Sequence, residues 1–242
     1  MGGLSAPLFR AEETPTLRLD DGRIVALRIR PKANARRIVL SVDVATGALN
    51  LSVPRRVSRA AAIDFAKSKS GWILARLATM PPRIAFVNGA TIPFLGRTLR
   101  LRHASELRGL AERQGDELRI GGDVAFLSRR TTDWLKREAK REFWERSQAK
   151  AERIGRSLRE VALRDSRSRW GSAGPGGRLM FCWRLIMAPE HVVDYVAAHE
   201  VAHLAHADHG PSFWALARSL AVDAAGARRW LRREGARLFR FG

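Results

Sequence analysis

The sequence of 242 residues contains one cysteine, Cys182, and no long apolar run. A single cysteine excludes an internal disulfide framework and a zinc site of paired thiolates, so other side chains must hold any metal. Because about 18 consecutive apolar residues never occur, no segment is expected to span a membrane. The N-terminal segment lacks an apolar core of signal-peptide length, and we therefore expect a soluble, cytoplasmic protein.

Lysine is also scarce, since it supplies only six of the 44 basic residues that give the chain a formal net charge of +20. A large positive charge favours nucleic-acid binding, because clustered cations neutralise phosphates and release counterions. The arginines are nevertheless spread along the chain, and the sequence is rich in alanine, which together indicate codon composition. A nucleic-acid partner is therefore an alternative that charge alone does not favour.

The chain divides into three regions that differ in composition and in the spacing of their apolar residues. Residues 1–22 form a polar lead-in that we expect to be flexible, residues 23–130 a β-rich half with one long helix, and residues 131–242 a mainly helical half. The length permits one large core or two modest ones, since single cores serve up to roughly 250 residues. We detect no internal repeat. These patterns predict an α+β fold.

Alternation of apolar and polar residues defines the β-rich half. Over residues 23–53 the alternation predicts a meander of three strands. Ser58 can cap the helix that follows, and the Met-Pro-Pro run at 80–82 would end it. Short strands are predicted within residues 83–127, where Asn-Gly and Gly-Gly pairs supply turns.

The second half is expected to begin with a long amphipathic helix at Thr131. A Gly-Pro-Gly-Gly turn between β-forming residues then predicts a hairpin, whose second strand, over 178–186, would offer an exposed edge to an extended peptide. Pro189 opens the next helix at a position where its missing N–H costs nothing. Gly210 and Pro211 would close that helix, and two further helices follow.

Four of the six histidines lie in one short segment, AAHEVAHLAHADHG. His199 and His203 are four residues apart on the helix that starts at Pro189, so their side chains stand one above the other and can share a zinc ion. Glu200 follows the first ligand and lies to the side of the metal, where its carboxylate can act as a general base. The pattern His-Glu-x-x-His is typical of zinc hydrolases.

A catalytic zinc usually has three protein ligands and one open position, so one more ligand is needed. His206 and His209 compete for this place. On a continued helix His206 would lie a turn beyond the metal, whereas His209 stands beside the Gly-Pro break, where the chain has turned. We therefore predict His209 as the third ligand and His206 as a spare or outer partner.

Other polar residues near the motif are candidates for supporting roles. Arg169, Arg184 and Tyr195 are possible contacts to the substrate or to a developing oxyanion. Asp194 and Asp208 are candidates to orient an imidazole from outside the ligand shell. The neighbouring aromatic residues are expected to pack around the site rather than to bind substrate; they are Trp170, Trp183, Phe213 and Trp214.

Further motifs surround the histidine segment. They are Arg169-Trp170-Gly171-Ser172, Trp183-Arg184-Leu185-Ile186, Ala188-Pro189, Asp194-Tyr195-Val196, and His209-Gly210 followed by Phe213-Trp214. With them the chain resembles the YgjP-like family of zinc metallopeptidases, related to SprT-like and WLM-type proteins with a minimal zincin core. The likeness extends more weakly over the first half, so it covers most of the chain.

The resemblance implies a zincin-like core, with a hairpin or sheet beside the His-Glu-x-x-His helix. It also implies one zinc ion per chain on His199, His203 and His209, with Glu200 as the base. Two positions depart from the family pattern: Ala173 replaces a frequent cysteine, and Cys182 a frequent asparagine. Neither is a ligand, so these departures bear on substrate contacts rather than on zinc.

These observations predict a zinc-dependent hydrolase, most directly a metallopeptidase acting on a peptide or protein. One alternative is a nucleotide pyrophosphatase that uses the same metal and base on a phosphoanhydride, because arginines near the motif suit an anionic substrate. No glycine-rich phosphate loop accompanies them. A second alternative is a nucleic-acid-associated protease, as the SprT-like relatives suggest. The patterns do not predict an oligomeric state.

Overall fold

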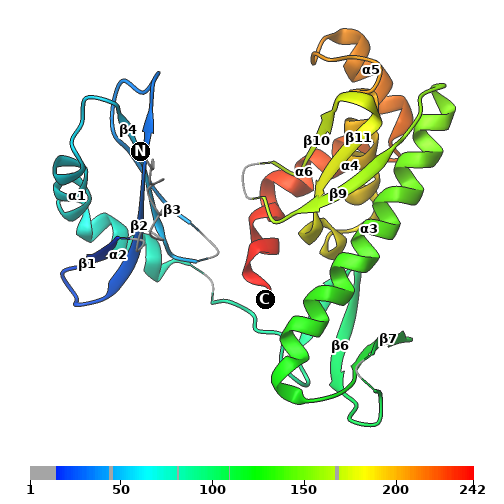
Figure 1. Cartoon of the computed structure of the whole chain (residues 1–242), viewed down its shortest axis with the longest axis horizontal. Coiled ribbons are helices and arrows are strands. Elements are labelled where there is room, and N and C mark those ends of the chain that lie inside the picture. The colour runs from blue at the N-terminus through cyan, green and yellow to red at the C-terminus, as the bar shows by residue number, and fades with distance from the viewer. Residues whose placement is uncertain (1–14, 44–45, 81, 109, 167–168) are drawn as a thin grey trace, which may run out of the picture. The chain divides into compact units, whose positions relative to one another are not determined.

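The computed structural model describes residues 15–43, 46–80, 82–108, 110–166 and 169–242, which form two compact units, Met1–Pro82 and Arg83–Gly242 (Figure 1). The described residues form six helices and three mixed sheets, so the predicted α+β fold is confirmed. The units divide after Pro82, whereas the sequence suggested a division at residue 131. None of the helices in the described part combines the length and apolar character needed to cross a bilayer.

The first unit is built on a four-stranded sheet with the order β1-β2-β4-β3. Its strands are β1 (Thr16–Arg18), β2 (Ile24–Lys32), β3 (Val39–Val42) and β4 (Leu49–Pro54). The predicted meander is wrong, because β2 pairs in parallel with β4 and leaves β3 at the edge. The more apolar β4, with Leu49, Leu51 and Val53 all buried, lies inside the sheet between β2 and β3. Part of the expected lead-in is β1, while residues 1–14 lie outside the described residues.

Two helices, α1 (Arg59–Lys67) and α2 (Ser70–Ala78), stand where one long helix was predicted. The predicted cap is confirmed, since the Ser58 hydroxyl accepts a hydrogen bond from the Ala61 N–H at 3.1 Å. The chain bends between the two helices, and the hydroxyl of Ser70 accepts a hydrogen bond from the Asp20 N–H at 3.1 Å. This bond ties the start of α2 to the turn after β1.

The second unit begins with another four-stranded sheet, of order β5-β6-β8-β7. Its strands are β5 (Thr91–Phe94), β6 (Arg97–His103), β7 (Ala111–Gln114) and β8 (Glu117–Ile120). The pairing repeats that of the first unit: an antiparallel pair, a central parallel pair and a second antiparallel pair. The two units therefore share a structural motif that the sequence did not reveal as a repeat.

This sheet belongs with the C-terminal helices because its end packs against them. The Phe94 ring lies 5.0 Å from that of Trp134 on α3 (Leu127–Arg153). The N–H of Leu95 donates to the carbonyl of Ile186 at 2.9 Å. The long helix starts at Leu127 rather than at Thr131, after a short 3-10 turn that Asp123 caps. These contacts explain why the division falls before the sheet.

A three-stranded sheet of order β10-β11-β9 lies beside the last helices (Figure 1). Its strands are β9 (Glu160–Arg164), β10 (Gly171–Gly174) and β11 (Arg178–Cys182). The predicted hairpin is confirmed as β10 and β11. The predicted edge is wrong, because β11 pairs with β9 on its other side and is central, which makes β10 and β9 the edge strands. Stacking of Phe181 on Phe143, with ring centroids 4.0 Å apart, fixes the sheet on α3.

Helix α4 (Glu190–Ala202) is the centre of the second unit, where it packs against α3, α5 (Pro211–Leu220) and α6 (Ala224–Glu234). Gly210 and Pro211 begin α5 instead of closing α4, and proline suits that first helical position. A buried cation also fixes α4. The Lys150 ammonium lies 2.6 Å from Asp194 and donates to the Leu220 carbonyl at 2.7 Å.

Candidate metal centre

The last turn of α4 presents His199, and His203 is the residue at which the helix ends. Helix α4 is buried around most of its circumference, mainly through valine and alanine side chains, because α3, α5, α6 and β10 all pack against it. At the predicted spacing of four residues the two imidazole centroids lie 5.1 Å apart. The segment before α5 then brings His209 back to the same place, with its ring centroid 4.7 Å from that of His203.

The three imidazoles meet as a ligand set. One nitrogen from each of His199, His203 and His209 lies within 4.8 Å of the others. The Nε2 atoms of His199 and His209 are 3.3 Å apart. A tetrahedral ion with bonds of about 2.05 Å separates its ligand atoms by about 3.3 Å, so this pair already has the spacing that zinc requires. The donor set therefore fits a zinc ion with three protein ligands.

The residue predicted as the spare has a different contact from the one expected. The backbone carbonyl of His206, rather than its ring, lies 3.0 Å from Nδ1 of His203. Because a carbonyl only accepts hydrogen bonds, Nδ1 of His203 must carry the hydrogen, which leaves Nε2 with its lone pair free for a metal. His206 thus orients a neighbouring imidazole through its main chain.

Aromatic packing holds the three rings. The Phe213 ring lies 4.9, 4.4 and 4.7 Å from the rings of His199, His203 and His209. Trp214 lies 5.7 Å from His199 and 5.5 Å from His209. Burial lowers the pKa of His199 to about 4, and repulsion from the other two histidines acts in the same direction. The imidazole of His199 is therefore neutral at neutral pH, as a metal ligand must be.

Glu200 is buried, with 4% of its surface exposed, and its carboxylate faces β10. Burial raises the pKa of Glu200 to about 8, while the positive charge of Arg169 opposes this rise. A carboxylate with so high a pKa has the basicity of a group that both accepts and returns a proton near neutral pH. A cation beside it would favour its ionised form.

Gly171 provides the space for that carboxylate. A Cβ atom added at Gly171 would lie 2.5 Å from Oε1 and 2.7 Å from Cδ of Glu200. These atoms belong to the end of the flexible Glu200 side chain. An added methyl group would therefore displace that side chain and would not unfold the protein. The glycine of the Arg-Trp-Gly-Ser motif thus sets the position of Glu200.

If Glu200 acts as the predicted base, we expect Gly171→Ala to lower kcat by about 100-fold, because displacing a catalytic group by about 1 Å has that effect. Zinc content and melting temperature should stay close to those of the unmodified chain. Gly71→Ala, in α2, is the matched control, since an added methyl group there meets nothing within 4 Å. Unchanged kcat in Gly171→Ala would show that the close approach has no role in positioning Glu200.

The structure separates the remaining candidates. Tyr195 lines the same pocket as His199 and Glu200, and burial raises the pKa of its hydroxyl. Arg184 is buried, and its guanidinium contacts other parts of the protein. Its Nε lies 2.7 Å from Asp165, and Nη1 donates to the Phe241 carbonyl at 2.5 Å. Arg169 is exposed and reaches Glu200 only through its charge.

The two acidic candidates make contacts away from the imidazoles. Asp208 accepts a long hydrogen bond, of 3.4 Å, from the Gly210 N–H at the start of α5. Asp194 pairs with Lys150 and accepts from the Val222 N–H at 2.9 Å. Cys182 is buried at the end of β11, and burial raises the pKa of its thiol to about 11. This departure from the family pattern therefore lies in the protein interior.

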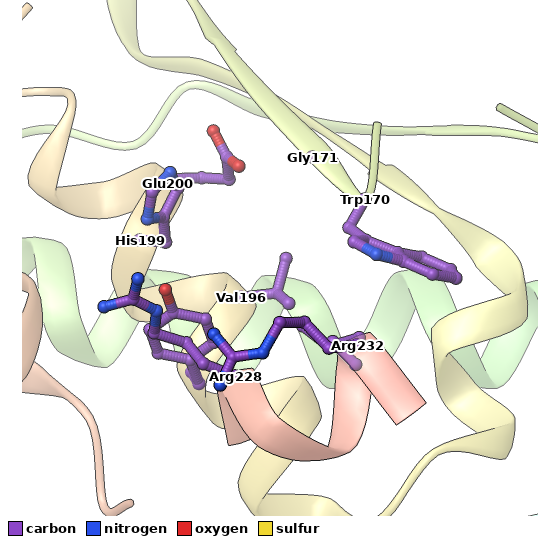
Figure 2. A pocket seen from close by; sticks show the side chains of 9 residues that line it. Trp170, Gly171, Val196, His199, Glu200, Arg228 and Arg232 are labelled. Atoms are coloured by element: carbon purple, nitrogen blue, oxygen red, sulfur yellow. The ribbon is translucent and has the colours of Figure 1, made fainter. Parts of the chain in front are cut away.

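Two residues that the sequence did not single out face the centre. Arg228 and Arg232 of α6 line a pocket of about 480 Å³ together with His199 and Glu200. Figure 2 shows this pocket between α6 and the strand end that carries Trp170 and Gly171. A stack of the Trp170 ring on Phe239, with centroids 5.4 Å apart, supports that wall.

A comparison with models of protein families finds a match over most of the chain. The model of a protein family described as YgjP-like, metallopeptidase domain, matches residues 36–234. The matched range contains the three histidines, Glu200, the second four-stranded sheet, and strands β3 and β4 of the first. Searches of curated proteins and of solved structures return no significant match.

Proposed function

Because the chain belongs to the YgjP-like family of metallopeptidases, we propose that it is a zinc-dependent peptidase with His199, His203 and His209 as the metal ligands. The observation that carries this proposal is the convergence of three imidazole nitrogens within 4.8 Å, next to the buried Glu200. One ion per chain is expected, because the described residues bring together one such set of ligands, and these leave one tetrahedral position open.

The bound zinc would polarise the carbonyl of the scissile peptide bond and lower the pKa of a water molecule. Glu200 takes a proton from that water and later delivers it to the leaving amine. The Tyr195 hydroxyl, which lines the same pocket, is proposed to donate a hydrogen bond to the oxygen on which negative charge develops. Because Gly171 has no side chain, it leaves room for the Glu200 carboxylate beside β10.

The peptide itself is proposed to bind along β10. This strand lies at the edge of its sheet among the described residues, and Gly171 at its start lies against Glu200. An extended peptide that pairs with such an edge gains main-chain hydrogen bonds and is held straight. The edge therefore aligns a peptide bond with the catalytic carboxylate.

The proposed activity is tested by incubating the zinc-loaded chain with fluorescent casein and, separately, with a panel of nucleoside triphosphates. We expect cleavage of casein, its loss on treatment with a chelator, and its return when zinc is added back. Release of pyrophosphate or phosphate from a nucleotide, with intact casein, would instead identify a nucleotide hydrolase. The second outcome would contradict the proposal.

A further inference from the structure

The pocket beside the candidate metal centre carries two cations without an acidic partner. Arg228 and Arg232 are one turn apart on α6, so both extend from the face that lines the pocket. No carboxylate in the described part of the chain forms an ion pair with either of them, although many other arginines there are paired. Among the described residues that line the pocket, Glu200 is the one acidic residue.

The rotation of α6 that presents these arginines is fixed by other contacts. Asp223 caps the helix by accepting a hydrogen bond from the Gly226 N–H at 2.8 Å. Ala227 is fully buried, and α6 packs against α4. The Arg228 guanidinium also lies over the Trp214 ring, 4.9 Å from its centroid, and Trp214 in turn packs on His199. The cation is thus held close to the metal ligands.

The remaining lining is apolar. Trp170, Val196 and Leu231 form walls against which methylene groups can pack. A pocket with two arginines and apolar side chains suits a ligand group made of a few methylene groups and a terminal carboxylate. Guanidinium binds carboxylate through paired, charge-assisted hydrogen bonds. A volume of about 480 Å³ accommodates an acidic side chain with the adjoining peptide backbone.

Resting on the proposed peptidase function, we propose that this pocket is a specificity site that binds a carboxylate of the substrate close to the scissile bond, through Arg228 and Arg232. The carboxylate comes either from an aspartate or glutamate side chain or from the C-terminus of the peptide. Both sources present the same group to the arginines, and the experiment below separates them.

The test measures peptide binding to the full chain carrying Glu200→Gln, which cannot turn the peptide over. Three heptapeptides with an uncharged fluorescent label are compared by anisotropy: one with a central glutamate and an amidated C-terminus, one with glutamine there, and one with glutamine and a free C-terminal carboxylate. We expect the glutamate or the free-acid peptide to bind about tenfold more tightly than the amidated glutamine peptide. If the glutamate peptide binds more tightly, the pocket recognises an acidic side chain; if the free-acid peptide does, it recognises the C-terminus of the peptide.

The variant Arg228→Gln/Arg232→Gln should abolish this difference. Arg229→Gln/Arg233→Gln is the matched control, because it removes the same charge from exposed positions of α6 that do not line the pocket. Non-specific attraction of acidic peptides to the basic chain is equal in both variants, so only a site at the pocket distinguishes them. The difference should also persist after zinc is removed with a chelator.

Equal affinity for all three peptides would overturn the proposal, as would a difference that survives in Arg228→Gln/Arg232→Gln or vanishes with the metal. Binding of a nucleoside triphosphate that depends on the two arginines, without binding of any peptide, would overturn it as well. Cleavage of casein by the unmodified chain is scored separately. Casein cleavage without peptide discrimination therefore removes this inference and leaves the proposed peptidase function standing.

Discussion

Replacement of Glu200 by glutamine is expected to lower kcat by about 10²–10⁴-fold, which is the usual contribution of a general base. Glutamine has nearly the same shape and fills the space beside Gly171, but it cannot accept a proton from water. Zinc content should not change, because the three imidazoles that form the ligand set do not include Glu200. The experiment compares casein hydrolysis with zinc measured by mass spectrometry in the same preparations.

The matched control is Glu190→Gln, which makes the same change at an exposed carboxylate in the first turn of the same helix. It should keep both activity and metal. Burial of Glu200 also means that glutamine removes a group whose ionisation is disfavoured there, so the variant should be no less stable to heat. Turnover at the rate of the unmodified chain would exclude Glu200 as the base.

The convergence of the three histidines could be predicted from the sequence because it depends on local geometry. His199 and His203 follow from helical spacing, and His209 from the break at Gly210, although the break begins α5 rather than ending α4. The structure brings together the three nitrogens that this reasoning selected. The carbonyl of His206 could not be foreseen, since its contact depends on how the chain turns after α4.

Arg228 and Arg232 were missed for a physical reason. Helix α6 carries two adjacent pairs of arginines, and the sequence alone does not show which pair faces inward. Only the burial of Ala227 and the packing against α4 fix that rotation. Arg184 illustrates the converse, because this cation, which lies over the rings of Trp183 and Phe239, contacts Asp165 and C-terminal carbonyls in the protein interior.

The elements of the sheets were easier to predict than their pairing. Alternating residues located β2, β3 and β4, but a parallel pair such as β2 and β4 is decided by burial of distant segments. The shared pairing of the two four-stranded sheets was invisible for the same reason, since pairing carries no local signal. The hairpin alone likewise does not show which of its strands lies at the edge. That depends on the pairing of β11 with β9, which comes from a segment before the hairpin.

His209 and His206 are expected to respond oppositely to replacement by alanine. In His209→Ala the zinc affinity should fall by more than 100-fold, since losing even an outer partner of a ligand typically costs about 10–100-fold. In His206→Ala it should change little, because the main-chain carbonyl that holds Nδ1 of His203 remains. Both side chains are outside the apolar core, so neither change should unfold the protein.

The pair is measured by competition with a chromophoric chelator, with circular dichroism as the check on folding and casein hydrolysis as the readout of activity. Activity should follow zinc occupancy, so excess zinc should restore His206→Ala fully and His209→Ala only in part. Each variant is the control for the other, because both remove one histidine from the segment between α4 and α5. Loss of zinc from His206→Ala with retention by His209→Ala would exchange the two assignments and place the third ligand on the turn directly after α4.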